Sequence, residues 1–407
     1  MSHLALGGGQ PAKSKPFPLW PQYDELERQA LLDVLESRDW WRTEGDKTGQ
    51  FERAFAAFHA AKYGLAVTNG THAIEITIAA LDIGWGDEVI VPDFTFIATA
   101  SAILSTGALP VLVDIDPETY CIDPDAVEAA ITPRTKAIIV VHMGGHPCDM
   151  DRLTEIAGRH GAALVEDSAH AHASEWRGRK VGTFGVAGTF SFQASKTMTA
   201  GEGGIILSND EAFDRTARSV HDCGRMPGRH FYEHFIYGSN YRLSEWQGAV
   251  LGAQLTRLDA QTALRDRNAR LLNDRLSAIE GITPQRLDER CTRNGHYLYL
   301  FHYDCAAFRG ASTARFIDAL NAEGIPTQAT YPPLHALEFF QSGAYRKRLA
   351  PNAGETDALR HQPFPISQRA LDEVVCLPQP VLLGDEDDVR EIAQAVEKVQ
   401  RFASELI

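Results

Sequence analysis

Short apolar runs recur along the first half of the chain, with room for a helix or a loop between them. Seven such runs lie between residues 66 and 208, at 66–68, 89–91, 111–113, 137–141, 163–165, 189–192 and 205–207. Nearly continuous apolar strands joined by crossovers of this length predict a mostly parallel seven-stranded sheet with helices on both faces. The pattern is typical of an α/β protein.

Polar residues mark the start of two helices between these runs. A helix is predicted over 73–81, after the turn that begins at Asn69. A second is predicted over 150–160, where Asp149 is a favourable N-cap. Both predicted helices connect strands of the sheet, as crossovers do.

Beyond residue 244 the pattern changes to a long helix and then to a smaller mixed unit. Apolar residues at helical spacing predict a helix over 244–281, with a break near Ala260. Residues 1–260 are therefore predicted to form a large domain, and residues 261–407 a smaller α+β domain. The elements expected in the smaller domain are a strand at 297–303, a helix at 313–323, a strand at 374–377 and a helix at 386–405.

Composition and charge narrow the possible functions. The 407 residues carry 54 acidic and 39 basic side chains, a formal net charge of −15, so the chain repels nucleic acid on average. The sequence contains neither a signal-peptide pattern nor the roughly 18 apolar residues of a membrane helix. We expect a cytoplasmic protein without a nucleic-acid or membrane partner. Its six cysteines form no C-x-x-C pair, and we expect them to be reduced.

Lys196 differs from the other lysines in its surroundings. It follows the apolar run at 189–192 and precedes the glycine-rich turn at 200–204. Loss of water at such a place lowers the pKa of an amine, which suits Schiff-base chemistry. A lysine that reaches from a loop into solvent is the alternative, and this segment alone does not decide between the two.

Asp167 ends the apolar run that starts at residue 163, at the carboxyl edge of the predicted sheet. Proteins of the α/β class bind their ligands at this edge. A carboxylate fixed there can pair with the ring nitrogen of pyridoxal phosphate and keep it protonated. Taken alone, such an aspartate is more often a helix N-cap.

Residues 67–73 have the pattern of a strand, a tight turn and a helix start. This arrangement directs backbone N–H groups and the hydroxyl of Thr71 toward an anion. The segment is not a P-loop, and the only near match, at residues 7–14, has Ala12 where glycine is required. No G-x-G-x-x-G follows a strand, which disfavours a dinucleotide enzyme. The segment therefore predicts a phosphate site of another kind.

Six motifs in a fixed order point to a known family. They are N-G-T at 69–71, P-D-F-T-F at 92–96, E-D-S-A-H-A at 166–171, the string 191–204, G-S-N-Y-R-L at 238–243 and Y-P-P-L-H at 331–335. Together they are far more specific than any one of them. The chain resembles the DegT/StrS family of pyridoxal-phosphate aminotransferases, which have the aspartate-aminotransferase fold (fold type I) and act on keto sugars and keto cyclitols. Within it, the chain looks most like inosose aminotransferases and 3-amino-5-hydroxybenzoate synthases of antibiotic pathways.

The resemblance implies a role for each matching residue. Lys196 would form the Schiff base, Asp167 would pair with the ring nitrogen, and His170 would lie beside the cofactor as a third catalytic residue. The other implied cofactor contacts are Gly70, Thr71, Phe96, Ser191, Gln193 and, from the second subunit of a homodimer, Asn240. Candidate substrate residues are Trp41, Arg42, Arg242, Tyr331 and His335.

The implied reaction moves an amino group from glutamine or glutamate to a keto cyclitol or keto sugar. Two other functions stay open. An aromatising 3-amino-5-hydroxybenzoate synthase would use the same lysine to eliminate water, and a regulator would bind the cofactor or a sugar without catalysis. Retention of Lys196 argues against the regulator, and also against the family's dehydratases, which have histidine at that position.

Three further groupings suggest other sites. His142, His146 and Cys148 have a spacing that suggests zinc, but the glycines and proline between them predict a turn, and we expect no metal. His170 and His172 alternate on extended backbone, so only one of them can face the site. The pair at 40–41, both tryptophan, forms either a substrate wall or part of an interface or core.

Overall fold

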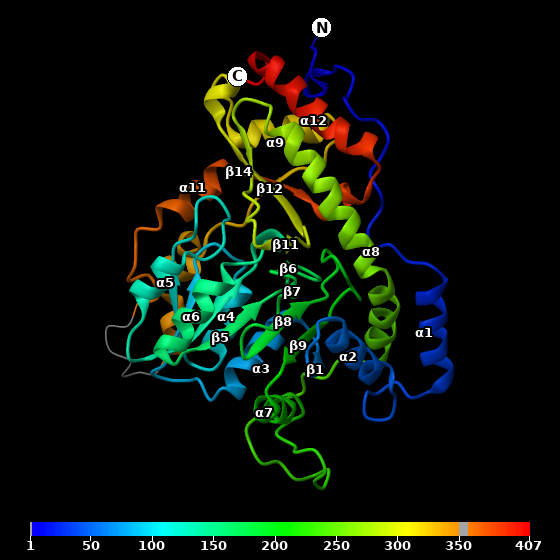
Figure 1. The fold of residues 1–407 in the computed structure, drawn as a ribbon, viewed down its shortest axis with the longest axis vertical. Coiled ribbons are helices and arrows are strands. Elements are labelled where there is room, and N and C mark those ends of the chain that lie inside the picture. The colour runs from blue at the N-terminus through cyan, green and yellow to red at the C-terminus, as the bar shows by residue number, and fades with distance from the viewer. Residues whose placement is uncertain (1, 350–356) are drawn as a thin grey trace.

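A seven-stranded sheet forms the centre of the larger part of the molecule in the computed structural model, which describes residues 2–349 and 357–407 (Figure 1). Its order is β1-β9-β8-β5-β4-β2-β3, and only β9 runs antiparallel to its neighbours. The strands are β1 Tyr63–Val67, β2 Glu88–Pro92, β3 Leu109–Val113, β4 Thr135–Val141, β5 Ala163–Asp167, β8 Ala187–Ser191 and β9 Gly204–Ser208. Each contains or overlaps one of the seven apolar runs, and the α/β prediction is confirmed.

Helices cover both faces of this sheet. On one face of β8 and β9, Phe55 of α2 and Leu251 of α8 (Glu245–Leu276) belong to one hydrophobic cluster with Phe190. On the other face, Ile76 of α3 and Phe213 of α7 pack against the same strands. The helices of this part are α1 Glu25–Ser37, α2 Lys47–Phe58, α3 Gly70–Ala80, α4 Ala98–Ser105, α5 Pro124–Ala130, α6 Met150–His160 and α7 Glu211–His221.

The two helices predicted between strands begin at the expected caps. The side chain of Asn69 accepts a hydrogen bond of 2.8 Å from the backbone N–H of His72 at the start of α3. The side chain of Asp149 accepts one from Arg152 at the start of α6. Each cap satisfies a backbone N–H group that has no partner inside its helix.

Helix α8 (Glu245–Leu276) runs without interruption from the sheet into the smaller part (Figure 1). The predicted break near Ala260 is wrong. Alanine has the highest helix propensity, and neither glycine nor proline occurs between residues 253 and 276. The hydroxyl of Thr262 donates to the carbonyl of Leu258, one turn earlier, so the polar side chain continues the helical pattern.

The smaller part is built on a four-stranded antiparallel sheet of order β10-β12-β14-β13. The strands are β10 Ile282–Pro284, β12 Leu298–Tyr303, β13 Gln328–Ala329 and β14 Val374–Pro378, and the helices are α9 Thr313–Ala322, α10 Glu338–Gln341, α11 Pro365–Glu373 and α12 Glu386–Arg401. The four elements predicted here are confirmed, although the last helix ends at Arg401 and continues as a 3-10 turn, Ala403–Glu405.

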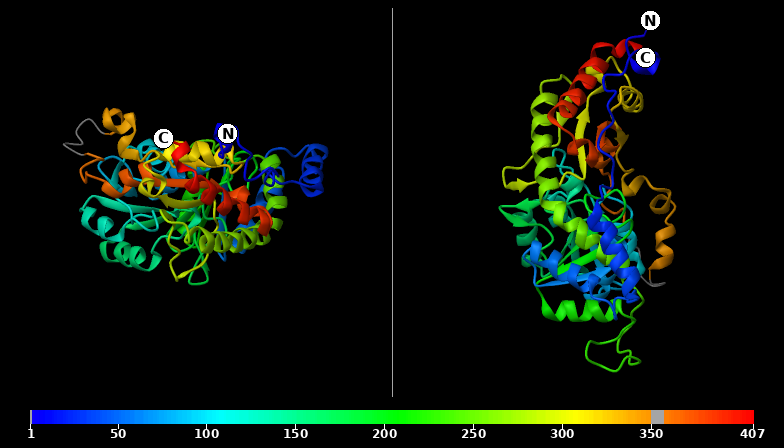
Figure 2. Two further views of the ribbon diagram at one scale, coloured as in Figure 1. Left: turned by 90° about the horizontal axis from the view of Figure 1, so that it is seen from above. Right: turned by 90° about the vertical axis from the view of Figure 1, so that its right-hand side faces the viewer.

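The first residues of the chain pack against this smaller part, as Figures 1 and 2 show. Leu4 belongs to its core, and the amine of Lys13 lies 2.5 Å from Asp388 and 2.7 Å from Glu391 on α12. The N-terminal segment therefore joins the unit that follows α8. The division of the chain near residue 260 stays a prediction.

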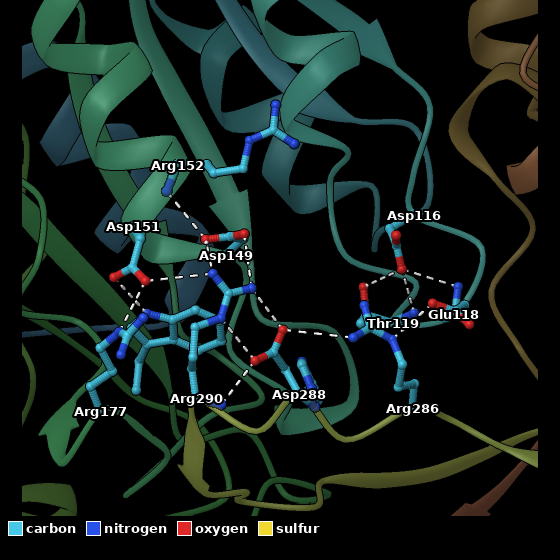
Figure 3. A network of polar contacts seen from close by, with 12 residues as sticks. Asp116, Glu118, Thr119, Asp149, Asp151, Arg152, Arg177, Arg286, Asp288 and Arg290 are labelled. Atoms are coloured by element: carbon cyan, nitrogen blue, oxygen red, sulfur yellow. Dashed lines mark hydrogen bonds and ion pairs between the residues drawn. The ribbon is translucent and has the colours of Figure 1, made fainter.

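A three-stranded sheet of β11 Cys291–Arg293, β6 Glu175–Trp176 and β7 Arg179–Lys180 lies between the two parts. Next to it, the guanidinium of Arg290 contacts Asp288 at 2.8 Å and Asp149 at 3.0 Å (Figure 3). The hydrogen bonds from Arg290 lower the pKa of Asp288 to about 2, against the opposing effect of burial. The network ties the segment after β10 to the start of α6.

Among the helices that the structure describes, none combines the length and the apolar character needed to span a membrane.

Candidate active site

A cavity of about 540 Å³ opens at the carboxyl edge of the large sheet. Strands β4, β5 and β8, the start of α3 and two tyrosines from the smaller part surround it. Nine of the predicted site residues line it, namely Gly70, Thr71, Phe96, Asp167, His170, Ser191, Gln193, Lys196 and Tyr331. Residues that are far apart in the sequence thus meet at the edge where α/β proteins bind ligands.

Asp167 lies at the end of β5 and is 7% exposed. One carboxylate oxygen accepts a 2.9 Å hydrogen bond from the hydroxyl of Thr99, and the other accepts one of 3.2 Å from the backbone N–H of Ala169. Burial raises the pKa of Asp167, while both hydrogen bonds and the charge of Lys196 oppose that rise. A cationic partner in the cavity would stabilise the ionised form of this carboxylate.

The lining of the cavity also includes a place suited to an anion. Helix α3 begins at Gly70, and its first N–H groups face the cavity together with Thr71. A Cβ atom on Gly70 would lie 2.8 Å from the Cβ of Ser191, so only glycine lets the two segments approach this closely. The hydroxyl of Ser191 accepts a hydrogen bond from the backbone N–H of Gln193. This bond holds the Ser191 side chain in place beside the anion site.

The amine of Lys196 lies 4.0 Å from the centroid of the Tyr297 ring. Burial lowers the pKa of Lys196, and the nearby Tyr297 and Asp167 partly oppose that effect. Hydrogen bonds fix the loop that carries Lys196. The indole of Trp20 donates to the carbonyl of Ala194 at 3.0 Å. The buried guanidinium of Arg265 donates to the carbonyl of Thr197. The reactive lysine is therefore held on a fixed turn.

His170 and His172 point to different surroundings, but the extended backbone predicted for them is wrong, because both lie in tight turns after β5. His170 lines the cavity, with its Nε2 3.2 Å from the hydroxyl of Tyr331. Its Nδ1 is buried and has no partner among the described residues. Burial lowers the pKa of His170 well below its ordinary value, so the ring is neutral at pH 7. His172 packs between Phe55 and Phe190, away from the cavity.

Ten other residues that line the cavity were not predicted as site residues, among them Thr99, Ser195, Glu202 and Tyr297. Thr99 lies in α4 and Tyr297 precedes β12. The sequence around each of them has no motif that indicates a position in the cavity. Tyr297 reaches Lys196 only because the small sheet packs over the edge of the large one. Glu202 belongs to the glycine-rich turn that was singled out, and its position beside the lysine was the available signal.

Five predicted residues do not line this cavity in the single chain: Trp41, Arg42, Asn240, Arg242 and His335. Arg42 pairs with Glu52 at 2.8 Å and Arg242 pairs with Asp222 at 2.5 Å. Both arginines border a second cavity of about 380 Å³.

The remaining three have other neighbours. The guanidinium of Arg242 lies over the ring of Trp41, with its central carbon 5.6 Å from the ring centroid. Asn240 is exposed and pairs through its backbone with Asp222. The imidazole of His335 contacts the buried Asp93 at 2.5 Å, next to the segment that carries Phe96. The roles expected for Trp41, Asn240 and His335 in binding cofactor or substrate stay predictions.

The histidine and cysteine grouping at 142–148 is a structural element. Nδ1 of His142 accepts from the backbone N–H of Cys148, and its Nε2 lies 3.3 Å from Glu166. Across the part of the chain that the structure describes, no three histidine, cysteine or acidic side chains are arranged to hold a metal ion.

Comparison with known proteins decides the family. The model of the DegT/DnrJ/EryC1/StrS aminotransferase family matches residues 21–397. The chain belongs to this family. It is 42% identical to a 3-amino-5-hydroxybenzoate synthase of Amycolatopsis mediterranei, with 94% of this chain and 97% of that protein covered. It is 41% identical to an L-glutamine:2-deoxy-scyllo-inosose aminotransferase of Streptoalloteichus tenebrarius, with 99% of both chains covered.

Solved structures of the family have the same fold. The crystal structure of a 3-amino-5-hydroxybenzoic acid synthase is 42% identical, covers 96% of this chain and 100% of its own, and has a TM-score of 0.87. That of DesV from S. venezuelae is 31% identical, covers 96% and 99%, and has a TM-score of 0.81. The chain is therefore a fold type I, pyridoxal-phosphate-dependent aminotransferase.

Proposed function

We propose that this enzyme moves the amino group of glutamine to the keto group of a cyclitol. The observation that carries this proposal is the meeting of Lys196 and Asp167 in one cavity, in a chain 38–41% identical to several L-glutamine:2-deoxy-scyllo-inosose aminotransferases. These relatives match over 98–99% of the chain, so the proposal draws on the whole enzyme.

The residues of the cavity fit pyridoxal phosphate. The start of α3, Thr71 and Ser191 would hold the phosphate, with Gln193 beside it, and the space that Gly70 leaves open is needed for that approach. Asp167 would pair with the ring nitrogen, since it is a buried carboxylate that lines the cavity. Phe96 and the neutral His170, with its free Nδ1, would contact the cofactor as well.

The lysine moves the proton in this proposal. When bound, the cofactor supplies an electron sink that stabilises negative charge on the carbon next to the amino group. Lys196 takes the proton from that carbon and returns it to the neighbouring carbon on the cofactor side. Its lowered pKa favours the neutral amine, the form that accepts a proton, more than in an ordinary lysine. The negative charge of Asp167 would stabilise the protonated ring nitrogen of the cofactor. The acceptor ketone is then aminated by the same steps in reverse.

The active unit in this proposal is a homodimer in which each subunit supplies Asn240 to the partner's phosphate site. The segment before Asn240 carries exposed aromatic side chains, with Tyr232 at 77% and Tyr237 at 92% exposure, as an interface segment would. Arg42 and Arg242 are the candidates for the donor's carboxylate. Each would have to loosen its present ion pair with Glu52 or Asp222 to bind it.

A second candidate function is that of a 3-amino-5-hydroxybenzoate synthase. It is favoured by the 42% identity to such an enzyme and by the TM-score of 0.87 to a solved synthase. Both reactions use the same lysine and carboxylate, so geometry does not separate them. The acceptor does, because the synthase eliminates water from its substrate and the aminotransferase needs only a ketone.

The test is incubation of the purified enzyme with glutamine and 2-deoxy-scyllo-inosose, followed by measurement of oxoglutaramate and of the aminated cyclitol. The proposal expects both products in equal amounts, and none with Lys196→Ala. Glutamate in place of glutamine measures the choice of donor. Formation of 3-amino-5-hydroxybenzoate from its aminated cyclic precursor, without turnover of the inosose, would establish the synthase instead. No turnover of either substrate would overturn the proposal.

A further inference from the structure

An aromatic ring lies against the reactive amine of this enzyme. The Nζ of Lys196 stands over the face of Tyr297, 4.0 Å from the ring centroid. Tyr297 directly precedes β12, so the ring comes from the smaller part of the molecule and the lysine from the larger. The contact therefore exists only when the two parts are packed together.

Tyr297 is itself held in place from two sides. Its hydroxyl lies 2.9 Å from the hydroxyl of Ser195, the residue before the lysine. The ring of His170 packs on it with centroids 4.3 Å apart and an interplanar angle of 32°. His170 is in turn bonded to the hydroxyl of Tyr331. A ring fixed in this way offers its face at a constant position.

The face of the Tyr297 ring can stabilise the positive charge of the Lys196 ammonium at that position. An ammonium over an aromatic face gains about 0.5–2 kcal/mol, and the gain is largest where water is excluded. Lys196 is in such a place, because burial is the main influence on its amine. Tyr297 and Asp167 both favour the charged amine and oppose the effect of burial.

We propose that Tyr297 is a further catalytic residue, whose ring face binds the ammonium of Lys196 whenever the lysine is free of the cofactor. The proposal rests on the role of Lys196 in the proposed function. The neutral amine accepts one proton from the donor's carbon and becomes an ammonium over the ring. It then gives the same proton to the neighbouring carbon and is neutral again, so no net proton is consumed. Between the two transfers the ring keeps the proton beside the reacting atoms.

Two substitutions separate the ring from its hydroxyl. Tyr297→Phe removes the hydroxyl and its contact with Ser195 but keeps the aromatic face. Tyr297→Leu removes both and leaves an apolar side chain that still excludes water. The difference between the two variants therefore measures the ring alone.

The experiment uses the full chain freed of cofactor. Competitive acetylation with acetic anhydride over a pH series, read by mass spectrometry of the peptide that contains Lys196, gives the apparent pKa of this amine. We expect Tyr297→Leu to lower it by about one pH unit, which corresponds to the cation–π gain. Tyr297→Phe should stay within about 0.3 pH unit of the native chain.

An equal lowering in both variants, or none in either, would overturn the proposal. Lys13, which is buried and paired with Asp388, reports folding in the same experiment, since it becomes reactive only if the chain opens. If it does so in Tyr297→Leu, the comparison is repeated with Tyr297→Met.

A second readout follows the donor half-reaction in a single turnover with glutamine. We expect Tyr297→Leu to slow it roughly 10-fold or more without raising KM, and Tyr297→Phe to remain within about 3-fold. If the native enzyme fails to transfer an amino group, the proposed function is wrong, whereas the labelling result still decides whether the ring holds the amine.

Discussion

The hydroxyl of Thr99 donates a hydrogen bond of 2.9 Å to the carboxylate of Asp167. Thr99 is 1% exposed, so this bond is made out of contact with water. It lowers the pKa of Asp167 and so opposes the effect of burial, which is the larger one. A side chain from α4 thus helps to keep the carboxylate at the end of β5 charged.

Removal of this hydroxyl tests its contribution. Thr99→Val keeps the shape and loses the bond, and we expect the affinity for pyridoxal phosphate to fall about 10-fold, because a hydrogen bond to a charged group contributes about 1.5 kcal/mol or more. Absorbance titration of the cofactor-free chain gives the dissociation constant. The control is Thr95→Val, whose hydroxyl contacts Thr99 and not the carboxylate. Unchanged affinity in Thr99→Val would show that Asp167 does not need this donor.

The phosphate end of the cavity depends on space at Gly70. Gly70→Ala places a Cβ atom 2.8 Å from the Cβ of Ser191, so the two segments must move apart. We expect at least about a 10-fold loss of cofactor affinity from a displaced donor set. Gly158→Ala in α6 is the matched control, because its Cβ would meet nothing within 4 Å. The control should bind normally and gain about 0.5–1 kcal/mol in stability. Normal binding by both variants would exclude this position from the phosphate site.

The Arg290 network gives a pH dependence of stability. Asp288 has its pKa lowered from 3.8 to about 2, chiefly by hydrogen bonds from Arg290. A depressed carboxyl pKa stabilises the folded chain above the unfolded value and ceases to do so as the pH falls through the folded one. We expect Arg290→Gln to lower the free energy of unfolding by about 1–2 kcal/mol at pH 7, allowing for solvent screening.

Urea unfolding at several pH values measures this difference. It should be constant down to about pH 5 and shrink between about pH 4 and pH 2. Arg177→Gln is the control, since that side chain is 61% exposed and pairs with Asp151. It should change stability by less than about 0.5 kcal/mol. A difference between Arg290→Gln and the native chain that grows on acidification would contradict this account.

Shared active sites can be tested by mixing two inactive proteins. Lys196→Ala removes the reactive amine, and Asn240→Asp places a carboxylate against the phosphate, where like charges repel. In a mixed dimer, the site with the intact lysine receives its Asn240 from the other subunit and is wholly native, while the second site carries both lesions. Activity should return to about half the native value per mixed dimer. If mixed dimers form and stay inactive, Asn240 serves its own subunit.

The sequence predicts the sheet better than the site. Buried parallel strands are continuous apolar runs, so β2 and β3, whose residues are all buried, stand out in one sequence. The antiparallel direction of β9 is not visible there, because an apolar run has no direction. Lys196 and Asp167 were recognised from their place after strands. Thr99 and Tyr297 were not, since only the packing of α4 and of the small sheet brings them to the cavity.

The arginines show the same limit. Arg42 and Arg242 were selected as cations for a carboxylate, and a sequence does not reveal that each already has an acidic partner within the chain. Likewise, the tight contact between Gly70 and Ser191 joins segments about 120 residues apart and follows from the neighbouring positions of β1, β9 and β8.

The most direct measurement is borohydride reduction of the purified enzyme, followed by peptide mapping. The account predicts a yellow protein that loses its colour on reduction and carries pyridoxal phosphate on one peptide, the one containing Lys196. Lys196→Ala treated in the same way should carry none. Attachment to Lys180 or Lys136, or an unlabelled native chain, would contradict the account.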